Sequence, residues 1–307
     1  MSVIDIRVRP PVGSLMELEI FPKPSEERTK SFGWFAPLPQ SIRQRSFDRF
    51  KQELDEVDVV HSVIWGREVS GRPEVSTRTS EIAAIIAQNP RMFSGLHGVG
   101  LPAPGTMQTV VEGIREALTT PGIIGITVDA QTALPPQPYS DDPRFYPAFE
   151  MCNRLGGILA LTISRGNEVS DNICYSNPES LDRIAGDFPD MDIVVSHSCW
   201  PWVLQSCGVA FRRPNVYLSP DLYAIRMPGY LDWIRAANTY LEDRLIFGSA
   251  YPRLGVVEMV LGYDDLPFAN ERVRRKVMFD NASSLLRKHG VALDVHSSPP
   301  MLDGQRT

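Results

Sequence analysis

A (β/α)8 TIM barrel, in the α/β class, is the fold that three features of this 307-residue sequence predict. Eight short runs rich in β-branched and aromatic residues recur along the chain, with helix-compatible sequence in most of the gaps. The runs are continuously apolar, which is typical of parallel strands covered by helices. Eight strand and helix units in about 250 residues match the size of one such barrel. An open, doubly wound sheet is the alternative, although no Gly-rich phosphate loop follows any run.

The predicted strands and helices follow in order from these runs. The strands are residues 3–8, 58–65, 91–99, 122–129, 157–164, 192–197, 215–220 and 244–250. Helices are expected in the gaps, where several segments begin with a capping residue and stop at Gly or Pro. The clearest are residues 79–89, 106–118, 142–156 and 178–188.

The gap after the first strand is the longest interruption of the pattern. Residues 10–57 begin with a segment rich in Pro and Gly that carries Trp34 and Phe35, and a first helix follows. A long loop at the top of a barrel acts more often as a lid or substrate wall than as a linker. We therefore predict one barrel domain over residues 1–290, with residues 10–57 as a lid-like insertion. Residues 291–307 form a C-terminal tail.

Composition excludes several classes of partner. The formal net charge of −6 gives no basic footprint for nucleic acid. No apolar run reaches the roughly 18 residues that span a bilayer, and the N-terminus lacks a secretory pattern. The four cysteines form no C-x-x-C pair, which fits a reducing compartment. These features predict a cytoplasmic protein that binds neither nucleic acid nor membrane.

Four segments carry a resemblance to a known family. They are SDDPRFYPAFEMCNRLGGILALTISRG, IVVSHSCWPWVLQSCGVAFRRPNVYLS, DRLIFGSAYPR and MFDNASSLL. In order and spacing the chain resembles the amidohydrolase-related (amidohydrolase 2) family of the amidohydrolase superfamily. That resemblance implies a (β/α)8 barrel and an activity among metal-dependent hydrolases and decarboxylases.

The resemblance also implies a ligand set that this sequence lacks. The family's first strand reads D-x-H-x-H, and Arg7 and Arg9 stand at the two histidine positions. Thr162 stands where the fifth strand usually supplies a histidine, and Ala250 replaces the aspartate of G-S-D-Y-P. Only His197, on the sixth strand, remains. One imidazole beside two guanidinium charges is a poor site for a divalent ion, so we expect no metal and no cofactor.

The remaining polar residues at the strand ends suggest a site for a small carboxylate. Arg7 and Arg9 are predicted to grip a carboxylate, or alternatively to form a structural ion network with Asp5 or Asp129. His197 is predicted to act as general acid and base, or to be an inert relic.

Further candidates are weaker, because each fits ordinary structure equally well. Asp221 could supply the lost carboxylate, or serve only a turn or a helix cap. Tyr251 could donate to an oxyanion, and the predicted substrate-binding residues are Arg7, Arg9, Trp65, Arg67, His97, Asp129 and Thr162.

The function predicted from these residues is metal-independent hydrolysis of a small carboxylated ester or lactone. An activated ester needs only a general base and cationic groups for the oxyanion. A lyase or isomerase acting on a small carboxylic acid is one alternative, and a non-catalytic descendant that binds a small anion is another. An unusual metal site made of His97, Asp129, His197 and Asp221 also stays open. The expected partner is a small carboxylate, and a homodimer is possible.

Overall fold

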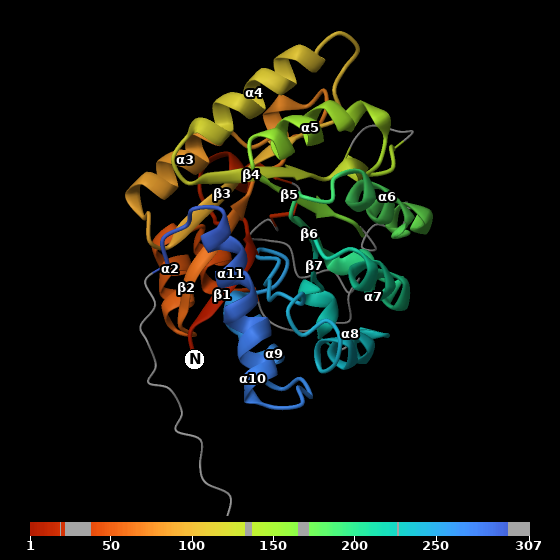
Figure 1. Cartoon of the computed structure of the whole chain (residues 1–307). Helices are drawn as coiled ribbons and strands as arrows, with labels where there is room; N and C mark the ends of the chain where they lie inside the picture. Colours follow the sequence, from red (N-terminus) through yellow and green to blue (C-terminus); the bar gives the residue numbers. More distant parts are fainter. Residues whose placement is uncertain (19, 22–37, 133–136, 165–171, 226, 294–307) are drawn as a thin grey trace, which may run out of the picture.

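A parallel sheet forms the centre of the molecule, and helices surround it (Figure 1). The computed structural model describes residues 1–18, 20–21, 38–132, 137–164, 172–225 and 227–293. Within this part, seven parallel strands pair in sequence order, each with the next along the chain. They are β1 (Val3–Val8), β2 (Val59–Trp65), β3 (Phe93–Val99), β4 (Ile123–Val128), β5 (Ile158–Thr162), β6 (Ile193–Ser196) and β7 (Val216–Ser219).

The predicted eighth strand, residues 244–250, lies between β7 and β1 and joins the two edges of the sheet. Single parallel bridges connect Leu218 with Leu245 and Val8 with Tyr251. The segment forms no regular ladder because two of its N–H groups do not bond to backbone carbonyls of a neighbouring strand. Phe247 donates to the carbonyl of Val277, and Ser249 donates to the carboxylate of Asp5. The TIM barrel is confirmed, with an irregular segment completing the ring.

Helices occupy the gaps where the sequence predicted them. Residues 79–89, 106–118 and 178–188 correspond to α3, α4 and α6, and 142–156 forms a 3-10 turn followed by α5. The helices are α1 (Gln40–Gln44), α2 (Phe47–Asp55), α3 (Thr79–Gln88), α4 (Met107–Thr119), α5 (Tyr146–Arg154), α6 (Glu179–Asp187), α7 (Val203–Arg212), α8 (Tyr230–Ala237), α9 (Val256–Asp264), α10 (Glu271–Arg275) and α11 (Asn281–Lys288).

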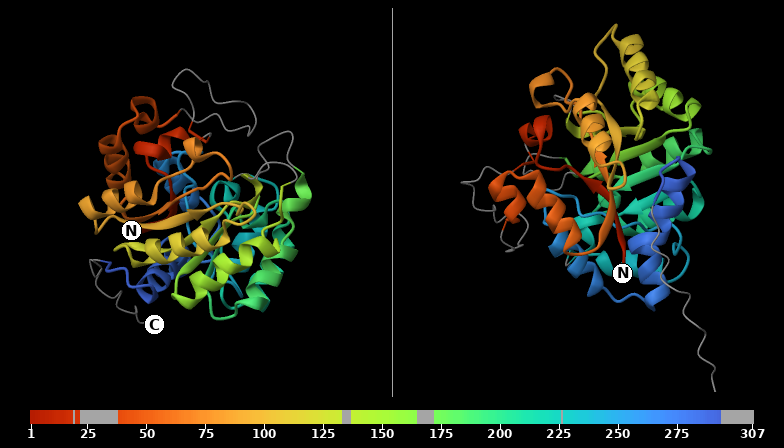
Figure 2. Two further views of the ribbon diagram at one scale, coloured as in Figure 1. Left: turned by 90° about the horizontal axis from the view of Figure 1, so that it is seen from above. Right: turned by 90° about the vertical axis from the view of Figure 1, so that its left-hand side faces the viewer.

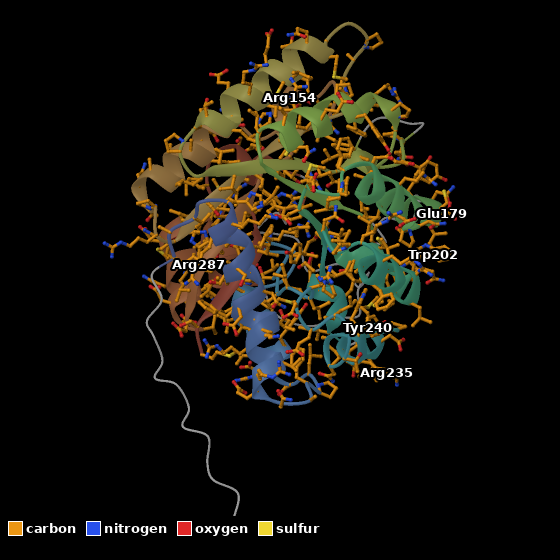
Figure 3. The ribbon with its side chains drawn as sticks, in the orientation of Figure 1. Arg154, Glu179, Trp202, Arg235, Tyr240 and Arg287 are labelled. Atoms are coloured by element: carbon orange, nitrogen blue, oxygen red, sulfur yellow. The ribbon has the colours of Figure 1, made fainter. Side chains whose placement is uncertain are left out.

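The two views of Figure 2 show these helices on the outside of the strands. Side chains labelled in Figure 3 follow the same arrangement, since Glu179, Trp202 and Arg235 lie at the periphery near α6, α7 and α8. No helix in the described ranges is both long and apolar enough to cross a membrane.

Apolar side chains pack on both faces of the strands. One cluster lies among Ile6, Val63 and Ile124 and includes Leu285 and Leu286 of α11. A larger cluster packs the other face of the strands against the surrounding helices. Helix α11 is fixed near the strand starts by His289, whose ring nitrogens bond the carbonyl of Gly156 and the carboxylate of Asp192. The opposite, carboxyl ends of the strands hold the buried charged residues.

The described part of the predicted insertion contains a 3-10 turn at Gly13–Glu17 and helices α1 and α2. Helix α2 begins after Ser46, whose hydroxyl accepts a hydrogen bond from the N–H of Arg49 at 3.1 Å. Trp34 and Phe35, and most of the predicted tail, lie outside the described residues. The lid role of residues 10–57 stays a prediction.

Candidate active site

Arg7, at the carboxyl end of β1, joins two residues that are about two hundred positions away in sequence. Its Nη1 lies 3.1 Å from Nε2 of His197 and 3.2 Å from Oδ2 of Asp221. The guanidinium also lies over the ring of Trp65, 5.3 Å from the ring centroid. All four side chains are buried. The predicted ion partners of Arg7 were Asp5 and Asp129, and the structure shows Asp221 in that role.

Asp221 is the centre of this network. Its Oδ2 accepts hydrogen bonds from the hydroxyl of Ser196 and from the backbone N–H of His197, and its Oδ1 accepts one from Ser219 at 2.7 Å. Burial alone raises the pKa of a carboxyl group, but here the nearby His197 and Arg7 and these hydrogen bonds lower the pKa of Asp221 below its usual value. Asp221 is therefore an ionised, fully buried carboxylate.

The contact with Arg7 fixes the protonation state of His197. A guanidinium can only donate, so Nε2 of His197 must carry a lone pair and the ring proton must be on Nδ1. Nδ1 lies 3.1 Å from Oδ2 of Asp221, although the pair is not aligned as a hydrogen bond. Burial and the charge of Arg7 lower the pKa of His197 to about 4. At neutral pH the ring is a neutral base facing a cation.

The backbone is strained where the sixth, seventh and eighth barrel segments end. Three consecutive residues, His197, Ser198 and Cys199, have φ values of 65°, 44° and 61°. Asp221 and Ala250 have φ values of 51° and 55°. Left-handed backbone at residues with a Cβ costs about 1–3 kcal/mol each, and such positions concentrate at functional sites. These left-handed residues lie in the turns from which the His197 ring and the Asp221 carboxylate reach the guanidinium of Arg7.

A second ion pair lies beside the first. Arg67, just beyond β2, binds the carboxylate of Asp129, which follows β4. Arg67 also acts electrostatically on Arg7 and Arg9. Arg9 contacts carbonyl groups instead, with Nε donating to Trp65 at 3.1 Å and Nη2 to Gly66 at 3.5 Å. Burial and the charges of Arg67 and Arg7 lower the pKa of Arg9 well below its ordinary value.

Two predicted site residues have their partners elsewhere. Nδ1 of His97 lies 2.6 Å from the hydroxyl of Thr79 at the start of α3, and burial lowers the pKa of the ring to about 4. The hydroxyl of Tyr251 lies 2.9 Å from that of Ser41, and its ring packs against Phe50 of α2. The structure thus joins neither residue to the Arg7 network through a hydrogen bond or an ion pair.

Thr162 and Asp5 are buried close to strand ends but play different parts. The hydroxyl of Thr162 makes no hydrogen bond within the described residues. Oδ1 of Asp5 accepts the backbone N–H groups of Arg7 and Ser249, so this carboxyl ties β1 to the irregular eighth segment. Burial raises the pKa of Asp5 to about 7. Asp5 is not the counter-charge of either arginine.

Sequence reasoning missed three residues of the network. Ser196 and Ser219 are the last residues of β6 and β7, and both bind Asp221. Their position as the final polar residue of an apolar strand was a usable signal. Tyr223 was missed as well; its ring meets that of His197 edge to face at 5.1 Å and stacks on Trp200 at 4.9 Å. No sequence pattern indicated that contact.

The residues present do not fit a divalent metal ion. In the described ranges no three or more His, Cys, Asp and Glu side chains are grouped so that they could hold one. Two members of the proposed unusual ligand set have other partners, since His97 binds Thr79 and Asp129 binds Arg67. The guanidinium of Arg7 contacts both of the other members, His197 and Asp221. A fixed cation repels a metal ion at that position.

Comparisons with known proteins agree with the barrel. A solved structure of an uncharacterized TIM-barrel protein, Bb4693 from Bordetella bronchiseptica, is 31% identical over 94% of this chain and 100% of its own, with a TM-score of 0.84. A 5-carboxyvanillate decarboxylase from Sphingomonas paucimobilis is 17% identical, with 93% of this chain and 99% of that one covered and a TM-score of 0.62. A 2,6-dihydroxybenzoate decarboxylase from Rhizobium is 12% identical, with 94% and 100% covered and a TM-score of 0.64.

The two decarboxylases share the fold at low identity. A search of curated proteins found no match. The amidohydrolase family model (Amidohydro_2) matches residues 4–288, which is nearly the whole barrel. The resemblance carried by the strand-end motifs is thereby confirmed, and the chain belongs to the amidohydrolase family.

Proposed function

We propose that this protein is an enzyme that hydrolyses a small carboxylated ester or lactone without a metal ion. One observation carries the proposal. The neutral ring of His197 has its lone pair on Nε2 and its other nitrogen beside the ionised carboxylate of Asp221. A base oriented by a buried carboxylate is the arrangement that general-base catalysis uses. Around it, Arg7, Arg9 and Arg67 supply the positive charge that an anionic substrate needs.

The proposed reaction needs no group that the chain lacks. Nε2 of His197 removes a proton from water, and the oxygen attacks the carbonyl carbon of the ester. Arg7 moves its N–H from Nε2 to the developing oxyanion, which frees the base and stabilises the new charge. The C–O bond then breaks, and the imidazolium returns the proton to the leaving alkoxide. The products are a carboxylic acid and an alcohol, or a hydroxy acid from a lactone.

A lyase acting on a small carboxylic acid is the second candidate. The likeness to two decarboxylases favours it, although at 12% and 17% identity that likeness concerns the fold. Decarboxylation would use the same arginines for the substrate and would release CO2 while a carbon atom gains a proton. The two reactions can be distinguished by the oxygen atoms of the product, because only hydrolysis must incorporate an oxygen atom from water.

A non-catalytic anion-binding protein is the third candidate, and the burial of His197 favours it. Its side chain is 7% exposed, and its Nε2 lone pair accepts a hydrogen bond from Arg7 in the absence of a ligand. Turnover decides between this candidate and the enzymes. A protein that binds carboxylates but converts no ester, lactone or hydroxybenzoate is a binding protein.

The test uses two groups of probes in water enriched in heavy oxygen. The first holds carboxylated aryl esters and lactones, such as the mono-p-nitrophenyl ester of glutaric acid. The second holds 2,6-dihydroxybenzoate and 5-carboxyvanillate. Hydrolysis with one solvent oxygen in the acid, abolished in a His197→Gln variant, supports the proposal. CO2 release from the second group alone supports the lyase instead, and unchanged turnover in His197→Gln contradicts the mechanism.

A further inference from the structure

The buried charges at the strand ends do not balance. Three arginines, Arg7, Arg9 and Arg67, are 4%, 2% and 8% exposed, and among the residues that the structure describes only Asp221 and Asp129 form ion pairs with them. Within this described set, three cations and two anions leave one positive charge. Asp5 forms no ion pair with the three arginines in the described part of the chain, and burial favours its neutral form. An uncompensated charge in a protein interior is costly unless a ligand neutralises it.

The unbalanced charge belongs to Arg9. Arg7 is paired with Asp221, and Arg67 is paired with Asp129. Among the described residues Arg9 donates hydrogen bonds only to the carbonyl oxygens of Trp65 and Gly66, and Asp129, which attracts it electrostatically, is already paired with Arg67. Arg253 also acts on Arg9, but it is partly exposed, so solvent screens its charge.

The geometry of Arg9 leaves one edge of the guanidinium available. The Nε and Nη2 groups form one edge, and that edge faces two consecutive carbonyls, those of Trp65 at the end of β2 and of Gly66. These bonds hold the planar group in one orientation. The other edge, made by Nη1 and the second hydrogen of Nη2, has no acceptor within the described residues. Two parallel N–H groups at that edge match the two oxygens of a carboxylate.

We infer that Arg9 is the anchor of the substrate and binds one carboxylate group end-on, while Arg7 stays with Asp221 and His197. This deepens the proposed function and depends on it only for the chemical class of the anion. The two arginines therefore have different roles, whereas the sequence predicted that both bind the carboxylate. Arg9 determines which molecules bind, and Arg7 sets the protonation state of the base.

Binding of benzoate, measured by calorimetry in low-chloride buffer, tests this assignment. We expect the native protein to bind benzoate and Arg9→Gln to bind it at least tenfold more weakly. Arg9→Lys keeps the charge but loses the two-pronged geometry, so its affinity should fall between the two. Arg213→Gln, which removes a surface arginine paired with Asp182, should match the native protein and controls for general screening.

A second control is the double variant Arg183→Gln, Asp141→Asn, which removes a partly exposed ion pair outside the Arg7 network. It leaves the excess charge on Arg9, so benzoate binding should stay within about threefold of native, a change of about 0.65 kcal/mol. Equal losses in this variant and in Arg9→Gln would overturn the assignment to Arg9. So would native-like binding by folded Arg9→Gln. If Arg9→Gln does not fold, native-like affinity of Arg9→Lys contradicts the two-pronged contact.

The inference about Arg9 and the proposed enzymatic function can be contradicted independently of each other. Benzoate held through Arg9 in a protein that converts no probe supports the inference and contradicts the proposed enzyme. Ester hydrolysis with the same KM and kcat in Arg9→Gln supports the enzyme and contradicts the inference.

Discussion

Nη1 of Arg7 lies 3.1 Å from Nε2 of His197, at a place where the family's motif puts two metal-binding histidines on the first strand. The guanidinium contacts both the surviving histidine and the buried carboxylate of Asp221. A metal ion at such a place would use the Nε2 lone pair as a ligand. Here a hydrogen bond uses it instead, which leaves the ring neutral and able to act as a base once Arg7 moves.

His197→Gln should lower kcat on a hydrolysed probe at least a hundredfold, because the base is removed. Benzoate affinity should change little, since Arg9 remains. The matched control is His61→Gln on β2, whose ring nitrogens both have protein partners, the carbonyl of Arg91 and the hydroxyl of Ser94. That variant should lose stability and keep kcat. Equal losses of kcat in both variants would contradict a chemical role for His197.

The acid limb of the pH profile should follow the lowered pKa of His197, which is about 4 because of burial and Arg7. The value of kcat/KM for the free enzyme should fall as the pH drops through about 4, and an inflection near 6.5 would contradict it. The free energy of unfolding should also fall as the pH drops through this range. The unfolded chain takes up the proton below pH 6.5, so this group costs stability as the pH falls from 6.5 towards 4. In His197→Gln that part of the acid destabilisation should vanish in urea titrations.

Asp5 should act on stability in the opposite direction. Burial raises its pKa from 3.8 to about 7, so the folded protein holds a proton that the unfolded chain releases. Stability from this group is complete below pH 3.8 and is lost as the pH rises to 7, by on the order of 4 kcal/mol at most. Asp5→Asn keeps an acceptor for the N–H groups of Arg7 and Ser249 and removes the charge.

The free energy of unfolding of Asp5→Asn, measured at pH 5 and pH 8, should therefore decline less than that of the native protein. A decline equal to the native one would show that Asp5 ionises normally in the fold.

Asp221→Asn should cost about 3–5 kcal/mol of stability, because it leaves the buried charge of Arg7 without a partner. Replacing Arg7 as well, by Met, should recover part of that loss, since both buried charges are then gone. A double-mutant cycle from chemical denaturation measures the coupling, expected at about 1–3 kcal/mol. Additive effects would mean that the 3.2 Å contact is energetically unimportant.

Ala250→Asp restores the one acidic residue of the family's eighth-strand motif, at a buried position with a left-handed backbone. We expect the variant to bind no zinc or manganese in elemental analysis after dialysis, because the cation of Arg7 still contacts both His197 and Asp221. The matched comparison is the triple variant Arg7→His, Arg9→His, Ala250→Asp, which restores the two histidines of the family's first-strand motif and the aspartate of its eighth-strand motif. Stoichiometric metal in the single variant would show that the arginines do not exclude the ion.

The sequence by itself determined the barrel, the family and the strand ends at which charged residues gather. Apolar runs of strand length between helical segments predict parallel strands wherever they occur, because that pattern depends on local spacing alone. It also placed His197 at the end of the sixth strand and Asp221 just past the seventh, since each stands at the end of a run.

Only the tertiary structure decided which partners these residues have. Arg7 and Arg9 are two positions apart, and strand periodicity puts them on one face with equal roles. In the folded chain the pairing of β1 with β2 shifts register between Asp5 and Val8. Arg7 contacts residues that follow β6 and β7, whereas Arg9 contacts the carbonyls of Trp65, the last residue of β2, and of Gly66. His97 and Tyr251 likewise contact residues of other segments, Thr79 and Ser41. Register, shear and left-handed backbone set these contacts over separations of up to 214 residues, and no local pattern encodes them.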